Sequence, residues 1–335
     1  MIEAADALRP AIPGLTTRPY RAGDGAAVSG LYTAMDSADG VPWRSTAEEM
    51  ENWMSRPTPS FDARRDATLA EVDGKPVAVR QVEWVDTNDG LREYRLGGGV
   101  HPDWRRRGIG RWLLRDAEAH ARERDAADPT DRPRFYGCWI PDVRTAAIEF
   151  IGREGYVPVR YFFEMARPSL DDIPEPTLPD GLVLRPVLPD QMKQLWDADI
   201  EAFVDHWGGF DSSDAAFQSW LGDPKFDPSL FVIAWDGDEI AGGVINEISE
   251  AENEAFNRKR GWLASVFVRR PWRRRGLARA LTLRSLEVLR ERGMTSAGLG
   301  VDADNPNAAL RLYEGTGFEV EFRSAAYRKP MEGDR

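Results

Sequence analysis

The stretch Arg273-Arg274-Arg275-Gly276-Leu277-Ala278 decides the fold, because a near-copy, Arg105-Arg106-Arg107-Gly108-Ile109-Gly110, stands in the first half of the chain. Each copy follows a run of strand-forming residues and opens an amphipathic run that is typical of a helix. A strand, a tight basic loop with glycine and a helix, in that order, form a phosphate-binding helix N-terminus. Two copies of such a long pattern indicate two copies of one folding unit.

Length and composition are those of an acidic globular protein with about two domains. The chain has 335 residues, of which 42% are hydrophobic and 30% are charged, and its formal net charge is -12. No run is apolar enough for a membrane helix, and the acidic N-terminus has no signal core, so we expect a cytoplasmic protein with no membrane partner. The single cysteine, Cys138, excludes an intrachain disulfide framework.

The distribution of charge points to a small anionic ligand. An acidic chain lacks the broad cationic surface that nucleic acids need, so no nucleic-acid partner is expected. Arginines nevertheless gather at the two loops, where a locally basic mouth suits a small polyanion. The histidines His101, His120 and His206 have no ligand spacing, so no metal is expected.

The hydrophobic pattern predicts the same order of elements in both halves, at a period of roughly 165 residues. In the first half it predicts helices at 26–35, 46–54, 110–124 and 145–153 and strands at 15–20, 67–72, 76–85, 91–100, 134–140 and 156–165. In the second half it predicts helices at 190–203, 213–221, 277–292 and 306–314 and strands at 182–187, 230–235, 239–248, 261–268, 296–301 and 318–327. The expected division is a domain at 1–168, a proline-rich linker at 169–180 and a domain at 181–331.

The second loop has the chemistry that a pyrophosphate needs. Gly276 allows the backbone to approach the phosphate, Ala278 keeps the next turn small, and Arg273 with its neighbours would add charge-assisted bonds. Two other phosphate motifs fail, because the chain has no Walker sequence and Gly108-x-Gly110 lacks the third glycine of a dinucleotide fingerprint.

A second motif, about 30 residues beyond the loop, completes a family pattern. Its residues are Asn305, Ala308, Tyr313, Glu314, Gly317 and Phe318. Loop and motif together resemble the GCN5-related N-acetyltransferase (GNAT) superfamily, and the tandem layout is similar to that of mycothiol synthase. The resemblance implies an α/β fold of two tandem GNAT domains, each a mixed, mostly antiparallel, splayed sheet flanked by helices.

The resemblance also implies acetyl-CoA as the acyl donor. Its pantetheine would pair with the fourth strand, and its pyrophosphate would lie on the loop. The residues so implied are Val266, Phe267, Val268, Arg273, Arg274, Arg275, Gly276, Leu277, Ala278 and Asn305, with Arg105, Arg106, Arg107, Gly108, Ile109 and Gly110 in the first half. His206 and Trp207 fall in the segment that shapes the acceptor pocket in the family, although they could equally be a structural pair. Asn305 could also serve only as a helix cap before Pro306.

Tyr313 matches the family's proton donor to the leaving thiolate, and a core aromatic is the alternative role. No carboxylate lies on the fourth strand, so the sequence leaves the general base unidentified. Glu247 and Asp302 are substitutes that could act through water, and an amine that loses its proton to solvent needs no base.

The first half differs from the second at the positions that match Tyr313 and Asn305. Alignment of the two halves sets Ile151 opposite Tyr313 and Val143 opposite Asn305, and neither side chain donates a proton. We therefore expect the first half to bind acyl-CoA weakly or to serve the structure, and the second half to carry the chemistry.

The expected reaction is acetyl transfer from acetyl-CoA to a primary amine of a small molecule or peptide, by direct attack in a ternary complex. A non-catalytic acyl-CoA sensor or scaffold is one alternative. A mycothiol synthase-type enzyme, acting on a cysteinyl pseudo-disaccharide, is the other. Two fused units take the place of a dimer, which favours a monomer or a weak homodimer.

Overall fold

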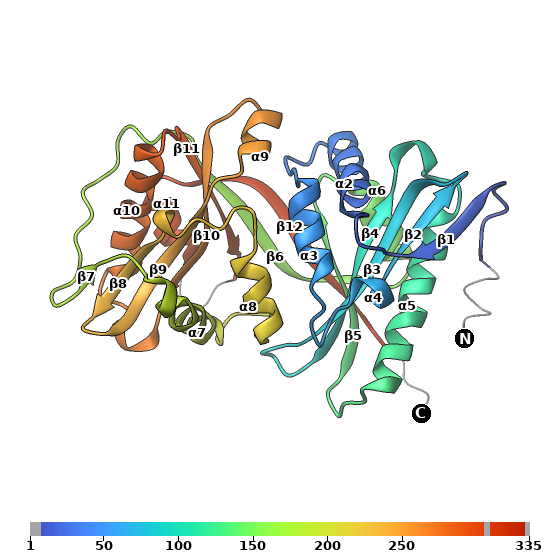
Figure 1. Ribbon diagram of the computed structural model, residues 1–335, viewed down its shortest axis with the longest axis horizontal. Helices are drawn as coiled ribbons and strands as arrows, with labels where there is room; N and C mark the ends of the chain where they lie inside the picture. Colours follow the sequence, from blue (N-terminus) through green and yellow to red (C-terminus); the bar gives the residue numbers. More distant parts are fainter. Residues whose placement is uncertain (1–7, 305–308, 332–335) are drawn as a thin grey trace. The chain divides into compact units, whose positions relative to one another are not determined.

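The computed structural model describes residues 8–304 and 309–331 (Figure 1). Contacts within the chain divide it into two compact units, each made of segments that are distant in sequence. Unit 1 comprises Met1–Val159, Trp207–Pro224 and Ala325–Arg335, and unit 2 comprises Arg160–His206 and Lys225–Ser324.

The first half of the chain forms the elements of unit 1, together with the start of β6. Its strands are β1 (Leu15–Pro19), β2 (Ala67–Val72), β3 (Lys75–Asp86), β4 (Arg92–Val100), β5 (Arg134–Pro141) and β6 (Val157–Arg167). Its helices are α2 (Gly25–Asp39), α3 (Ala47–Ser55), α4 (Ala63–Asp66), α5 (Ile109–Ala127) and α6 (Thr145–Arg153), and α8 (Asp214–Leu221) joins this unit from the second half.

The second half repeats this order, mostly in unit 2. Its strands are β7 (Val183–Leu184), β8 (Val232–Asp236), β9 (Glu239–Glu247), β10 (Arg260–Val268), β11 (Ser296–Asp302) and β12 (Glu319–Pro330). Its other helices are α7 (Met192–Phe203), α9 (Glu250–Ala255), α10 (Leu277–Glu291) and α11 (Ala309–Glu314). Short 3-10 turns precede both basic loops, at Pro102–Trp104 and Arg270–Trp272.

Local sequence explains how several elements begin and end. Thr46 caps α3 in a capping box with Glu49, which satisfies two backbone N–H groups at the start of the helix. Asp73 and Gly74, which turn β2 into β3, both have positive φ angles, of 50° and 76°. This is the geometry of the tight hairpin that an Asp-Gly pair favours.

Each unit has a mixed, mostly antiparallel sheet, as the sequence predicts. The strand order is β1-β2-β3-β4-β5-β12 in unit 1 and β6-β11-β10-β9-β8-β7 in unit 2. The parallel pairs, β4 with β5 and β10 with β11, are short, and they stop at Arg95↔Gly137 and Leu263↔Leu299. Beyond these residues the two central strands of each sheet diverge, which is the expected splay.

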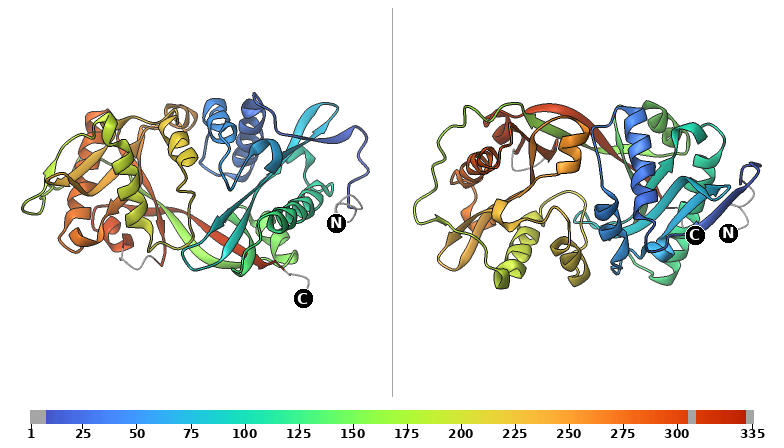
Figure 2. Two further views of the ribbon diagram at one scale, coloured as in Figure 1. Left: turned by 60° about the horizontal axis from the view of Figure 1, so that its bottom comes forward. Right: turned by 45° about the horizontal axis from the view of Figure 1, so that its top comes forward.

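Helices cover both faces of each sheet. In unit 1, α2 and α3 pack with Leu69 on one face, and α5 packs with Ala70 on the other, because adjacent strand residues point to opposite faces (Figure 2). In unit 2, α10 and α11 bury their apolar residues in a large core cluster with Leu263 and Leu299. Helix α7 packs on β9 and β10.

The two units exchange a strand, and this differs from the predicted contiguous division at 168 and 181. Residues 160–167 of β6 belong to unit 2, where Ala297↔Arg167 begins the pairing with β11. The last residues of β12 belong to unit 1, where Ala325 and Tyr327 join the core. The segment predicted as a linker lies in unit 2, and its Leu170 is only 2% exposed.

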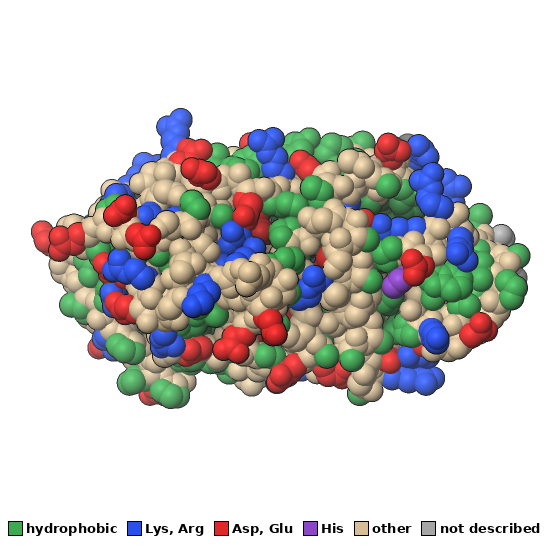
Figure 3. Space-filling view, turned by 90° about the horizontal axis from the view of Figure 1, so that it is seen from above, with side chains coloured by type: hydrophobic (Ala, Val, Ile, Leu, Met, Phe, Trp, Pro, Cys, Tyr) green, Lys and Arg blue, Asp and Glu red, His purple; other side chains and the backbone are tan. Residues whose placement is uncertain are grey.

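One other expectation about the elements differs from the structure, because the strand predicted at 182–187 forms only as β7. The structure also has two short helices, α4 and α9, that the hydrophobic pattern does not predict. The first residues of the helix predicted at 306–314 lie outside the described residues, and α11 begins at Ala309. In the described part, no helix has the length and apolar character to cross a membrane. Basic and acidic side chains are interspersed on the face shown in Figure 3.

Candidate functional site

The second basic loop presents its backbone at the start of α10. Arg274 and Gly276 both have positive φ angles, of 61° and 85°. Gly276 is the N-cap, and the first helical bond is donated by the N–H of Ala280 to its carbonyl at 3.1 Å. The N–H groups before Ala280 have no carbonyl partner within the helix, and a Cβ atom at Gly276 would meet no heavy atom within 4 Å. This open turn can accept a phosphate.

Arg273, which we expected to contact phosphate, is bonded within unit 2. Its Nε donates to the carbonyl of Val268 at 2.9 Å, and its two terminal nitrogens bond Asp205 and the carbonyl of Ala202, each at 2.9 Å. The side chain therefore ties the loop to the end of β10 and to the residues after α7. Arg274 and Arg275 are exposed, so these two are the arginines of the loop that can reach a ligand.

The first basic loop has the same backbone but a different surrounding. Arg106 and Gly108 have φ angles of 63° and 86°, and Arg105 bonds the carbonyl of Val100 at 3.2 Å and Asp39 at 2.6 Å. A Cβ atom at Gly108, however, would lie 3.3 Å from Cγ of Pro10. Pro10, near the N-terminus, thus lies against the turn at Gly108 in unit 1, whereas the matching turn at Gly276 in unit 2 is open.

Further ion pairs surround the first basic loop. Arg144, which follows β5, bonds Asp36 and also lies 3.2 Å from Asp39, which Arg105 holds from the loop. Burial raises the pKa of Asp36 to about 6. These pairs fasten α2 to both the loop and the start of α6.

Tyr313 lies where the sequence motif predicts, in the short helix α11. It is 6% exposed, packs edge-on against Phe318 at 6.0 Å between ring centroids, and belongs to the core cluster of unit 2. Burial raises its pKa above the usual value. Among the described residues its hydroxyl has no hydrogen-bond partner. Val266 and Val268 of β10 pack against the same cluster, whereas Phe267 points to the other face and is 2% exposed.

The two substitute bases are already paired. Arg160 bonds both oxygens of Asp302, at 2.8 and 2.9 Å, and the N–H of Asp304 donates to the same carboxylate. Glu247 lies 3.2 Å from Lys225. An amine that approached either carboxylate would compete with a cation that is already in place.

His206 and Trp207, predicted to shape the acceptor pocket, fall in different units. His206 is half-buried beside Phe203, with 4.4 Å between ring centroids, and burial lowers its pKa. Trp207 stacks under the guanidinium of Arg328 at 4.4 Å. Asn305, the remaining predicted contact, lies outside the described residues.

One polar pair was missed by sequence reasoning. Asp199 of α7 accepts a hydrogen bond from Ser265 Oγ of β10 at 2.7 Å, and burial raises the pKa of this carboxyl to about 6. A signal was present in the sequence, because Asp199 stands four residues after the buried Leu195 and three before the buried Ala202. An acidic residue on the apolar stripe of a helix is unusual.

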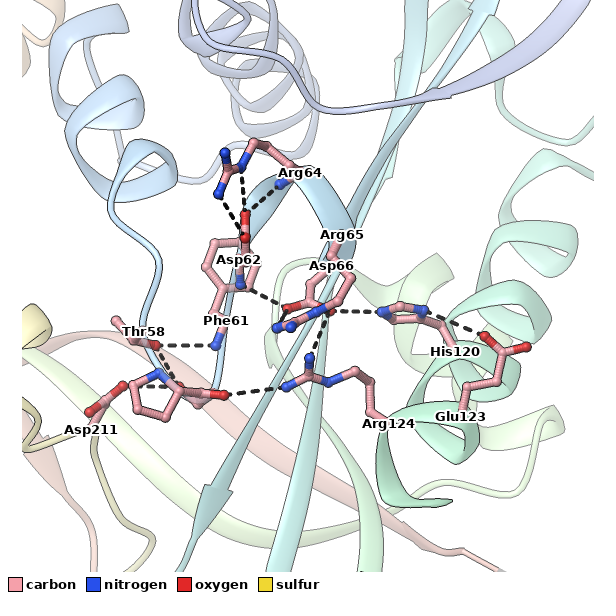
Figure 4. A network of polar contacts seen from close by, with 12 residues as sticks. Thr58, Phe61, Asp62, Arg64, Arg65, Asp66, His120, Glu123, Arg124 and Asp211 are labelled. Atoms are coloured by element: carbon pink, nitrogen blue, oxygen red, sulfur yellow. Dashed lines mark hydrogen bonds and ion pairs between the residues drawn. The ribbon is translucent and has the colours of Figure 1, made fainter. Parts of the chain in front are cut away.

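Asp66 lies at the centre of a polar network in unit 1. Asp66, which is fully buried, accepts bonds from Arg65 and His120 at 2.7 and 2.8 Å, and Arg124 lies 3.8 Å away (Figure 4). These bonds hold the pKa of Asp66 well below its usual range. In the described part of the chain, no group of three or more His, Cys, Asp or Glu residues could hold a metal ion.

Comparisons with known proteins agree with this architecture. The model of the acetyltransferase (GNAT) family matches residues 192–318, and that of an acetyltransferase (GNAT) domain matches residues 64–158. A mycothiol acetyltransferase of Geodermatophilus obscurus is 30% identical over 309 residues, which cover 91% of this chain and 94% of that protein.

Solved structures give the same result for the whole chain. A GCN5-related N-acetyltransferase from Sphaerobacter thermophilus is 28% identical, with a TM-score of 0.68, and the match covers 96% of this chain and 97% of that one. A tandem GNAT protein from the clavulanic acid biosynthesis pathway has a TM-score of 0.71 at 19% identity, over 96% of this chain and 100% of that one. The second likeness concerns the fold.

Proposed function

Because the chain belongs to the GNAT acetyltransferase family and is an acyl-CoA-dependent N-acetyltransferase, we propose that unit 2 transfers the acetyl group of acetyl-CoA directly to a primary amine of a small molecule. The single observation that carries the assignment to unit 2 is the contrast between the two loops. The turn at Gly276 is open, whereas Pro10 lies against the turn at Gly108. Unit 1 then serves the structure.

Different residues of unit 2 bind the pyrophosphate and the pantetheine of acetyl-CoA. The N–H groups of the first turn of α10 bind the pyrophosphate, and Arg274 and Arg275 add charge to its rim. The free edge of β10 beyond Leu263, where β11 has diverged, offers backbone groups around Val266–Val268 to the pantetheine amides. One of these N–H groups polarises the thioester carbonyl and stabilises the oxyanion.

Tyr313 acts on the leaving sulfur. Transfer of a proton from a phenol to a thiolate is uphill by roughly 2 kcal/mol with ordinary pKa values. Burial raises the pKa of Tyr313 further, so its hydroxyl is a weaker acid than an ordinary phenol. Tyr313 therefore stabilises the departing thiolate mainly through a hydrogen bond from its hydroxyl.

The acceptor that we test first is of the mycothiol type. A mycothiol acetyltransferase of about the same length as this chain is 30% identical to it, which supports the amine of a cysteinyl pseudo-disaccharide. A panel of other primary amines, including aminoglycosides, amino acids and peptide N-termini, accompanies it. The measurement is the release of free thiol from acetyl-CoA. If no amine of the panel causes this release, the proposed acetyl transfer to a primary amine is overturned.

Titration calorimetry tests the location of the cofactor. We expect one acetyl-CoA site in the wild-type protein, and its loss in Gly276→Asp, because a carboxylate beside the amides repels the pyrophosphate. Gly108→Asp places the same change in the other loop and is expected to keep the site. Gly276→Asn separates charge from backbone strain. Two sites, or a site lost only in Gly108→Asp, would contradict the assignment to unit 2.

A further inference from the structure

Asp199 and Ser265 join a helix to the point where the sheet of unit 2 opens. Ser265 lies two residues beyond Leu263, the last residue of β10 that pairs with β11. At this point β10 also changes register against β9, because Leu263 faces Asn246 and Ser265 faces Ile245, so that Ala264 is an extra residue. Such a bulge redirects the side chains that follow it.

The side chain of Ser265 points away from the face that holds Tyr313. Val266 and Val268 pack against the core cluster that contains Tyr313 and α10. Adjacent residues of a strand point to opposite faces, so Ser265 and Phe267 face the other side, where α7 packs. Asp199, on α7, therefore approaches the mouth of the splay from the face opposite to Tyr313.

The described residues give Asp199 no counter-ion. Within the described residues, its one hydrogen bond is the one from Ser265 at 2.7 Å, and it forms no ion pair. The other charged side chains nearby form ion pairs with different partners. On α7 and the turn after it, Lys193 pairs with Asp197, Glu201 with Arg269, and Asp205 with Arg270 and Arg273. On β9, Glu239 pairs with Arg269 and Glu247 with Lys225. On β10, Arg260 pairs with Glu321. His206, after α7, is half-buried beside Phe203.

We propose that Asp199 accepts the proton of the acceptor amine, with Ser265 as the residue that positions its carboxylate. This inference rests on the proposed function, and it supplies the base that β10 itself lacks.

In the step itself, the amine nitrogen forms a bond to the thioester carbon and the carbonyl becomes an oxyanion. The nitrogen loses a proton to the carboxylate of Asp199. The oxyanion collapses, the carbon–sulfur bond breaks, and the leaving thiolate accepts a hydrogen bond from the hydroxyl of Tyr313. Solvent then removes the proton from Asp199 and protonates the thiolate, so the products are an amide and a thiol.

The carboxyl has a pKa suited to this task. Burial raises the pKa of Asp199 to about 6, although the hydrogen bond from Ser265 opposes the shift. A general base works best with a pKa near the working pH, and an ordinary aspartate, near 4, lies further from an amine. Asp199 remains ionised at pH 7 and is a stronger base than a solvated aspartate.

The test compares Asp199→Asn with Asp197→Asn, an exposed carboxylate on the same helix that pairs with Lys193. The substrate is the best amine of the panel above, and kcat/KM is measured from pH 5 to pH 9. We expect Asp199→Asn to lower kcat/KM at least ~100-fold with the acetyl-CoA Kd unchanged, and Asp197→Asn to leave both unchanged. Asp199→Glu is expected to recover part of the rate.

The pH profile separates catalysis from structure. In the wild type, log kcat/KM falls with unit slope below the pKa of the amine and with a slope of two below about pH 6, where Asp199 takes up a proton. Asp199→Asn keeps only the unit slope. Ser265→Ala removes the hydroxyl that donates to the ionised carboxylate of Asp199, so the lower break of its pH profile is expected at higher pH.

Two failures are distinguishable. If the wild type acetylates no amine, the proposed function fails and this inference fails with it. If the wild type is active and Asp199→Asn retains both its rate and the slope of two, only the assignment of Asp199 is overturned. If Asp199→Asn does not bind acetyl-CoA, the pH profile of Ser265→Ala is the test. A lower break at higher pH than in the wild type supports the inference, and an unshifted break overturns it.

Discussion

Tyr313 in unit 2 and Ile151 in unit 1 hold the same place in their helices. The carbonyl of each accepts the N–H of the aromatic residue five positions later, Phe318 at 3.0 Å and Tyr156 at 3.1 Å. One side chain ends in a hydroxyl and the other is a hydrocarbon. The two units therefore share this backbone turn but differ in whether the side chain at this position carries a hydroxyl group.

We predict that Tyr313→Phe lowers kcat about 100-fold or more and leaves the acetyl-CoA Kd unchanged. The variant keeps the ring and its packing against Phe318, so the melting temperature should change little. Steady-state kinetics and calorimetry measure the two effects. An unchanged kcat would return Tyr313 to the role of a core aromatic.

The buried Asp66 makes unit 1 sensitive to acid. Its pKa is held far below the usual range in the folded state, so its stabilising effect is present above about pH 4, the unfolded pKa, and is lost as the pH falls further. We predict that Asp66→Asn lowers the free energy of unfolding by about 3 kcal/mol at pH 7. The difference from the wild type should shrink below pH 4 in urea unfolding experiments.

A matched control for this variant is Asp103→Asn, whose side chain is 84% exposed. Its free energy of unfolding should equal that of the wild type at both pH values. An Asp66→Asn protein as stable as the wild type at pH 7 would show that the network around Asp66 is replaceable by neutral hydrogen bonds.

At the scale of elements, each basic loop is a strand-to-helix connection fastened by its first arginine. Arg105 and Arg273 both bond the last carbonyl of the preceding strand and an aspartate at or just after the end of a helix. The repeated pattern RRRG thus contains one residue that is bonded internally and a part that is exposed to solvent. The two are adjacent in sequence, but only one of them points to solvent.

Replacement of Arg273 and Arg275 should separate these roles. Arg273→Gln loses bonds to Asp205, Val268 and Ala202, and we predict a loss of about 2 kcal/mol of stability. Arg275→Gln should leave stability unchanged and weaken acetyl-CoA binding by about three- to tenfold, with a smaller salt dependence. Thermal unfolding and calorimetry at two salt concentrations check both. Equal effects of the two variants on Kd would contradict the division.

At the scale of the whole molecule, each unit is completed by a strand from the other half of the sequence. Part of β6 joins the sheet of unit 2, and the end of β12 joins the core of unit 1. Sequence halves and structural units are therefore different divisions of the chain. Each half on its own leaves an open sheet edge and an unfilled core.

We predict that residues 1–168 and residues 169–335, expressed separately, give no cooperative thermal unfolding transition. Mixed or co-expressed, the two pieces should form a complex that unfolds cooperatively, because each then regains its missing strand. Circular dichroism and size-exclusion chromatography make the measurement. A piece that folds alone as a monomer would show that the exchanged strand is dispensable.

The positions of most strands and helices follow from the sequence, because their signals are local. The strand at 67–72 and the helix at 145–153 agree residue for residue with β2 and α6, since alternation, stripes and turn residues act over a few positions. The repeat, the basic loops and the motif at Tyr313 are likewise visible without coordinates. The short helix α9 was missed because its few residues carry no full hydrophobic period.

What the sequence by itself determined is the family, the two-fold repeat and the chemistry available in each loop, all of which depend on residue types at fixed spacing. The tertiary structure decided which half of the chain completes each sheet, that Arg273 is engaged internally, and that Asp199 meets Ser265 at the splay. These outcomes depend on contacts between residues far apart in the chain, such as the 66 positions between Asp199 and Ser265. No local pattern encodes such contacts, because packing of whole elements sets them.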